Sequence, residues 1–213
     1  ELGLHGRFAT LEQPDLFARQ RTRLAAHASN PIAGVRQHFL RMRPGATQRA
    51  MADAGFRYDS TFGFSDRNGF RLGVGDVVPM WDDATGETLD IDEVPFIWMD
   101  RALSKYRGIE DPGAWVDDAL ALAARCREVE GLWTGIWHPN LAPALGFPDA
   151  PRAFDALCEG LMRESPWSAT LGEIVQWRRG RRTARAIEAP GGGGWAGGGG
   201  GGGALPVRVA GGA

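Results

Sequence analysis

Cysteine is scarce in this sequence, which has only two among 213 residues, Cys126 and Cys158. They stand far apart and form no Cys-x-x-Cys pair, so neither a zinc knuckle nor a disulfide framework is expected. Both fall on apolar faces of predicted helices, where cysteine is usually a small core residue. We therefore interpret both as core residues.

Lysine is scarcer still, because Lys105 is the only one and every other basic residue is arginine. The 24 basic and 26 acidic residues give a net charge of −2. A nucleic-acid-binding domain usually presents a basic surface, so no nucleic-acid partner is expected. The arginines of residues 178–185 are typical of a solvated helix C-terminus, where the helix dipole favours positive charge.

A long apolar run is also missing. The longest uncharged stretch, residues 131–148, is interrupted by three prolines. A membrane-spanning helix needs about 20 apolar residues, so no span is expected. The first residues show no basic segment followed by an apolar one, so we expect no signal peptide. This favours the cytoplasm but does not fix the compartment, and the sequence leaves the oligomeric state open.

Apolar residues make up 43% of the chain, enough to bury one core. Segments with β-branched and aromatic residues alternate with segments of helical periodicity. The expected strands are residues 1–5, 34–40, 92–99 and 132–137; helices are expected over 11–29, 45–54, 112–126, 154–162 and 171–177, and loops over 56–90. This alternation favours an α/β fold with parallel strands.

The glycine content divides the chain into two parts. Of the 31 glycines, 13 lie in residues 191–213. We therefore expect a domain over residues 1–185 and a Gly-rich tail over residues 186–213, since long glycine runs behave as flexible linkers. The alternative is a short β appendage, in which residues 186–189 pair with 205–209.

Three of the four histidines fall at or near the C-terminal end of a predicted strand: His5, His38 and His138. The fourth, His27, lies in a helix. Active sites of barrel-like α/β proteins are built at that end of the strands. Neutral imidazole binds zinc and similar ions, and a histidine can also protonate a leaving group. Any one of them could instead be a hydrogen-bonded rim residue, but their shared placement favours a site.

A metal-dependent hydrolase also needs a carboxylate. The candidates are Asp59, Asp66, Asp82, Asp83, Asp92, Glu93 and Asp100. Tryptophans could stack on sugar rings, although aromatic side chains more commonly pack in the interior. The tryptophans in question are Trp81, Trp98, Trp133 and Trp137.

Several segments, taken in order along the chain, resemble motifs of the polysaccharide deacetylase (NodB-like) superfamily, in its bacterial exopolysaccharide subgroup. Residues 1–6 resemble the metal-histidine motif and residues 34–39 the Arg-x-Pro-Tyr motif. Residues 55–61 resemble the Gly-Phe-x-Tyr-Asp-Ser-Ser segment and residues 136–138 the final Leu-x-His motif. The resemblance covers roughly residues 1–180. It implies a distorted (β/α) barrel and a metal-dependent hydrolase that removes acyl groups from N-acetylated, or O-acetylated, polysaccharides.

The resemblance also implies roles for single residues. His5 matches a metal ligand, Arg36 the arginine that orients the catalytic base, and His138 the general acid. The implied cofactor is a divalent metal, with zinc as the first candidate, and the implied partner is a carbohydrate. We expect Asp59 and Trp137 to contact the substrate.

The sequence departs from the family pattern at its metal site. Four residues after His5, where a second metal-binding histidine is usual, stands Ala9. His38 occupies the proline position of the Arg-x-Pro-Tyr motif and is the candidate replacement. The Thr-x-Asp-Asp segment, which supplies the base and an aspartate ligand, would precede residue 1 and is absent. We therefore expect a barrel incomplete at its N-terminus and inactive over these residues. The alternative is a non-catalytic carbohydrate-binding or structural barrel with a degenerate metal site.

Overall fold

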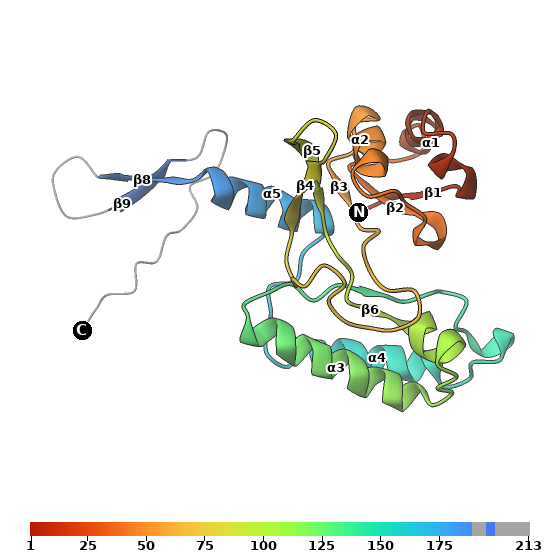
Figure 1. Ribbon diagram of the computed structural model, residues 1–213. Helices are drawn as coiled ribbons and strands as arrows, with labels where there is room; N and C mark the ends of the chain where they lie inside the picture. Colours follow the sequence, from red (N-terminus) through yellow and green to blue (C-terminus); the bar gives the residue numbers. More distant parts are fainter. Residues whose placement is uncertain (189–194, 199–213) are drawn as a thin grey trace.

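The computed structural model describes residues 1–188 and 195–198 (Figure 1). Within them, five strands form one sheet in the order β1-β2-β3-β5-β4. The strands are β1 (Leu4–Gly6), β2 (Gly34–Gln37), β3 (Tyr58–Asp59), β4 (Val78–Asp82) and β5 (Glu87–Glu93). The first three strands and β5 run parallel, and β4 is antiparallel to β5.

Two helices, α1 (Leu16–Ala25) and α2 (Ala46–Asp53), pack against this sheet. The apolar cluster that the helices and the sheet share contains Leu4, Phe17, Ile32, Val35, Met51, Phe56 and Ile91. Successive side chains of a strand point to opposite faces. The neighbours of these strand residues therefore point away from α1 and α2.

A second group of elements follows the sheet in sequence. The short strands β6 (Trp98–Met99) and β7 (Gly135–Ile136) form a parallel pair. The helices α3 (Pro112–Glu128) and α4 (Ala150–Met162) lie side by side next to it (Figure 1). Their core contains Ile97, Trp98, Leu103, Trp115, Ala119, Cys126, Leu141, Ala150 and Leu157. The linking turns are three 3₁₀ turns, η1 (Phe8–Leu11), η2 (His38–Leu40) and η4 (Pro143–Leu145), and a π-helical turn, η3 (Ala102–Tyr106).

The last long helix, α5 (Leu171–Thr183), returns to the first sheet. Its Ile174 and Val175 join a buried cluster with Tyr58 of β3 and Val94 beyond β5. After α5, β8 (Arg185–Glu188) pairs antiparallel with β9 (Trp195–Gly198). The expected partner segment, residues 205–209, lies outside the described residues. The domain boundary at residue 185 stays a prediction.

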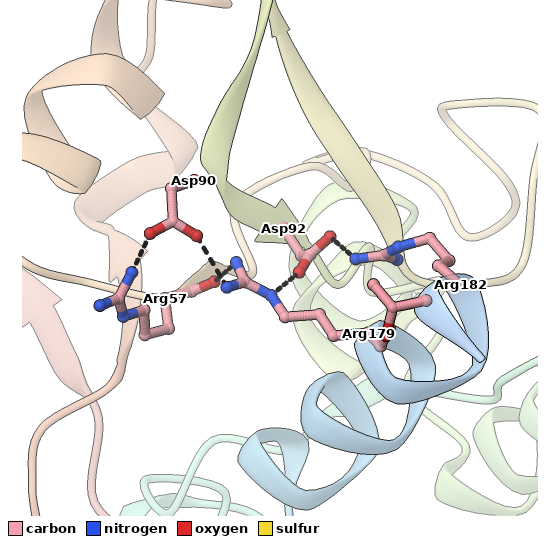
Figure 2. Close-up of polar contacts among 6 residues, drawn as sticks. Arg57, Asp90, Asp92, Arg179 and Arg182 are labelled. Atoms are coloured by element: carbon pink, nitrogen blue, oxygen red, sulfur yellow. Dashed lines mark hydrogen bonds and ion pairs between the residues drawn. The ribbon is translucent and has the colours of Figure 1, made fainter. Parts of the chain in front are cut away.

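An ion-pair network fixes the C-terminal end of α5 to the sheet (Figure 2). The side chain of Asp92 of β5 is only 2% exposed and accepts hydrogen bonds from Arg179 and Arg182, the latter at 2.6 Å. Asp90 bridges Arg179, at 2.8 Å, and Arg57. The expectation of a merely solvated arginine run is therefore wrong for Arg179 and Arg182, because a buried carboxylate needs paired cations.

The prediction of loops over residues 56–90 is also wrong. This segment contains β3, β4 and most of β5, and β4 and β5 form a hairpin. In the turn, Asp82 accepts a hydrogen bond from the Ala84 N–H at 2.9 Å, and Gly86 has a φ of 71°. The strand expected over residues 92–99 is two strands, since β5 ends at Glu93 and β6 begins at Trp98.

The alternation of strands and helices predicted an α/β fold with parallel strands, and this prediction is confirmed. The described strands form a sheet of five, a parallel pair and a hairpin, so closure into a barrel stays a prediction. None of the helices in the described part of the chain is long and apolar enough to cross a membrane.

Candidate functional site

A cavity of about 820 Å³ lies between the ends of the first three strands and the β6–β7 pair. His5, Arg36 and His38 line it from the sheet side, and Arg101 and His138 from the other side. This volume falls within the range of roughly 300–1,000 Å³ that is usual for ligand pockets. The structure thus brings four of the predicted site residues to one cavity.

Strand register explains why these side chains meet. His5 of β1 stands opposite Arg36 of β2, and Gly34 stands opposite Tyr58 of β3. Leu4 and Val35, one position earlier, belong to the core under α1 and α2. Because side chains alternate along a strand, His5 and Arg36 are turned to the other face, where the cavity lies.

His5 and His38 form the first pair of the site. The Nε2 atom of His5 lies 3.0 Å from Nδ1 of His38, and the rings meet edge to face. Phe39 and Leu40 follow in left-handed conformations, with φ of 53° and 54°. Such a conformation costs about 1–3 kcal/mol in a non-glycine residue and is found mostly at functional sites. It lies in the turn η2, which begins at His38 directly after β2 and beside the cavity.

Burial lowers the pKa of His5 below the ordinary imidazole value, and the nearby His38 and Arg36 lower it further. The neutral imidazole, which is the form that binds a metal ion, is therefore favoured. Ligands of one tetrahedral zinc ion lie about 3.3 Å apart, given bonds of about 2.0–2.1 Å. The 3.0 Å between His5 and His38 is close to that spacing.

The described residues do not complete a zinc site, however. Among them, no group of three or more histidine, cysteine, aspartate or glutamate side chains could hold one metal ion. Catalytic zinc usually has three protein ligands and one open position. His5 and His38 therefore fit two of the three protein positions.

His138 and Asp100 form the second pair. Asp100, which is fully buried, accepts hydrogen bonds of 2.5 Å from both the main-chain N–H and Nδ1 of His138. The two residues follow the parallel strands β6 and β7, whose ends are neighbours. The hydrogen bond to Asp100 therefore places a proton on Nδ1 of His138. Because His138 lines the cavity, its Nε2 is the ring nitrogen left for chemistry there.

Arg36 is held by Ser60 rather than by a carboxylate. Its Nε donates to the main-chain oxygen of Ser60 at 2.8 Å and its terminal nitrogen to the Ser60 hydroxyl at 2.9 Å. The ring of Phe96 lies 5.7 Å from the guanidinium carbon. Burial lowers the pKa of Arg36, and the charges of Asp59 and Glu93 oppose this. Arg36 is thus a fixed cation at the cavity wall.

Asp59 and Trp137, the expected substrate contacts, are not among the residues that line the cavity. Asp59 is fully buried on the opposite face of β3 from Tyr58 and accepts a 2.9 Å hydrogen bond from Gln48 of α2. Trp137 is partly buried, stacks on Trp98 with ring centroids 6.0 Å apart, and packs against the core beside α3 and α4. Strand alternation and aromatic packing account for these two positions.

Asp59 instead forms a buried carboxyl pair with Glu93. The two residues stand opposite each other on β3 and β5. Burial raises the pKa of Asp59, and burial together with the charge of Asp59 raises the pKa of Glu93 well above its usual value. Ionisation of one carboxyl group therefore disfavours ionisation of the other.

The pairing of Asp100 with His138 was not predicted from the sequence, in which Asp100 was only one of seven candidate carboxylates. The available signal was positional: Asp100 directly follows one short apolar strand, and His138 follows another. In parallel strands such ends meet at one edge of the sheet.

No family model matches the chain, and no curated protein matches it. Among solved structures, the chain is similar to the crystal structure of a "putative polysaccharide deacetylase" from Mycobacterium smegmatis, with a TM-score of 0.59 and 22% sequence identity. The match covers 84% of this chain and 60% of that chain. At this identity the likeness concerns the fold. The chain therefore has a mixed α/β fold similar to that of this structure and spans about three fifths of the protein it matches.

Proposed function

We propose that this chain carries part of the active site of a metal-dependent deacetylase that acts on acetylated saccharides. The observation that carries the proposal is that the His5–His38 pair and His138, which Asp100 holds from behind, line one cavity. The first pair suits metal binding and the second suits proton transfer. The likeness in fold supports the choice of deacetylation among hydrolytic reactions.

In this proposal His5 and His38 hold a divalent cation, for which zinc is the first candidate. A bound divalent cation supplies polarisation of the acyl carbonyl and activation of water. The third protein ligand and the base are not assigned to any described residue. The lowered pKa of His5 keeps its imidazole available as a ligand.

His138 acts as the general acid. When both ring nitrogens carry a proton, Nδ1–H is held by Asp100 and Nε2–H gives its proton to the departing amine or alcohol as the acyl bond breaks, which leaves the neutral Nδ1–H imidazole. Asp100 serves as a positioning residue, because its two hydrogen bonds fix the ring and its tautomer. Arg36 contributes a fixed positive charge at the wall of the cavity.

A second candidate function is binding of saccharides without catalysis. The observation that favours it is the incomplete set of ligands, since the described residues offer two histidines and no third metal-binding side chain. A cavity of this size would still accept a sugar chain.

The test combines zinc titration with an assay on a chromogenic acetyl ester and an N-acetylated oligosaccharide. The deacetylase proposal expects zinc-dependent acetate release from a form of the protein that also supplies the base and the third ligand, and in that form His138→Ala should reduce it by about two to four orders of magnitude. His27→Ala, a change at an exposed histidine on α1's C-terminal side, is the matched control. Saccharide binding without acetate release, unchanged by zinc, would favour the binding function.

A further inference from the structure

The charges that face the cavity are predominantly positive, although the whole chain has a net charge of −2. Three fixed cations line it, Arg36, Arg101 and Lys105, together with three histidines. Among the described residues, the only acidic one that lines the cavity is Glu1, which accepts a 3.1 Å hydrogen bond from the Gly172 N–H. The cavity therefore attracts anions, although the chain as a whole carries a small net negative charge.

Arg101 and Lys105 are the cations left without an acidic partner. Neither forms an ion pair with any residue that the structure describes, whereas Arg36 has the buried carboxyl pair behind it. Arg101 is half-buried, with Phe147 5.8 Å from its guanidinium carbon. Lys105, the only lysine of the chain, lies 5.3 Å from the ring of Tyr106. Both cations are thus available to a ligand.

The backbone between these residues is the π-helical turn η3, which directly follows Asp100 and Arg101. A π-helix bonds residue i to residue i+5, so Arg101, Lys105 and Tyr106 project from one side of the turn. Ala102 and Leu103 are fully buried, and the Leu103 carbonyl accepts a 3.0 Å hydrogen bond from Ile109. The turn is therefore anchored, and π-helical turns of this kind occur frequently at functional sites.

We propose that the saccharide bound in this cavity is acidic, and that Arg101 and Lys105 bind its anionic group while Tyr106 contacts a sugar ring. This inference rests on the proposed function and narrows its substrate class. Charge-assisted hydrogen bonds from Arg101 and Lys105 would hold a uronate carboxylate or a sulfate ester. Because Asp100 precedes Arg101 directly, the anion lies close to the pair that contains His138.

Calorimetric titration with three tetrasaccharides tests the inference on the chain as it is. Hyaluronan tetrasaccharide is acidic and N-acetylated, tetra-N-acetylchitotetraose is neutral and N-acetylated, and tetragalacturonate is acidic without acetyl groups. We expect the hyaluronan tetrasaccharide to bind at least about tenfold more tightly than the neutral one, with an affinity that falls as salt rises. Arg101→Gln and Lys105→Gln should each weaken its binding about three- to tenfold.

Arg23→Gln is the matched control, because Arg23 is an exposed arginine on α1 away from the cavity. Equal binding of the acidic and neutral acetylated sugars, unchanged by the substitutions at Arg101 and Lys105, would overturn the inference and leave the deacetylase proposal standing. Equal binding of the two acidic sugars, both weakened by these substitutions, would support the anion site and count against acetyl recognition. Tighter binding of a single-stranded oligonucleotide than of either acidic sugar would overturn the assignment to saccharides.

Discussion

Asp100 accepts two hydrogen bonds of 2.5 Å from His138, one from its main-chain N–H and one from its ring Nδ1. The carboxylate is fully buried, while the imidazole reaches the cavity. Two contacts from one residue fix both the position of the backbone and the orientation of the ring. This pair links the fold, through the ends of β6 and β7, to the proposed proton transfer.

In a form of the protein that also supplies the base and the third ligand, Asp100→Asn should lower kcat for acetate release by about two to four orders of magnitude, because the amide cannot hold the same imidazole tautomer in place. KM should change little, since Asp100 does not line the cavity. Steady-state kinetics and thermal melting, with Asp66→Asn as the exposed control, check this prediction. A lower melting temperature with unchanged kcat would mean that the pair is only structural.

His5→Ala and His38→Ala should each weaken zinc binding by about tenfold or more, because each removes one of two imidazole ligands. The pKa of His5 lies below that of a free imidazole, so zinc binding should persist to a lower pH than in a free histidine pair. Competition with a zinc-binding dye at several pH values measures both effects. His27→Ala serves as the control, and equal zinc affinity in all three variants would remove these residues from the metal site.

Glu93→Gln should flatten the pH dependence of stability. The pKa of Glu93 is higher in the folded state than in the unfolded state. Protonated Glu93 therefore stabilises the fold fully below its unfolded-state pKa, and this stabilisation is lost as pH rises through its folded-state pKa. Over that window one proton changes the free energy of unfolding by up to about 1.4 kcal/mol per pH unit. Urea unfolding from pH 5 to pH 8 measures the slope. Glu87→Gln, on the exposed start of β5, should keep the wild-type slope, and an unchanged slope in both variants would contradict the prediction.

Asp92→Asn should lower the free energy of unfolding by about 3 kcal/mol, because Arg179 and Arg182 lose their buried counter-ion. Asp90→Asn should cost under about 1 kcal/mol, since Asp90 is 68% exposed and its ion pairs are screened by water. Urea unfolding of the two variants compares the same chemical change on the same strand. Similar losses at both positions would show that burial of Asp92 does not set the strength of the network (Figure 2).

Much of the helical structure could be predicted because its signals are local. Asp111 caps α3 by accepting a 2.9 Å hydrogen bond from the Gly113 N–H, and Thr170 and Glu173 form the capping box of α5. The β4–β5 hairpin was missed although the turn after Asp82 has polar residues and Gly86 in a left-handed conformation. The residues that favour such a turn are neighbours in the sequence, so the hairpin could in principle be predicted from the sequence.

For the candidate site, too, one part could be predicted from the sequence and another part could not. The residue types, and the position of His5, His38 and His138 after strand-like segments, can be seen in the sequence because strand propensity is a property of a few neighbouring residues. Which of these side chains meet depends on how the strands pair and pack. The register of parallel strands puts His5 beside His38 and Asp100 beside His138, and strand alternation turns Asp59 into the core. Register depends on packing between segments that lie more than 30 residues apart, and no local pattern encodes it.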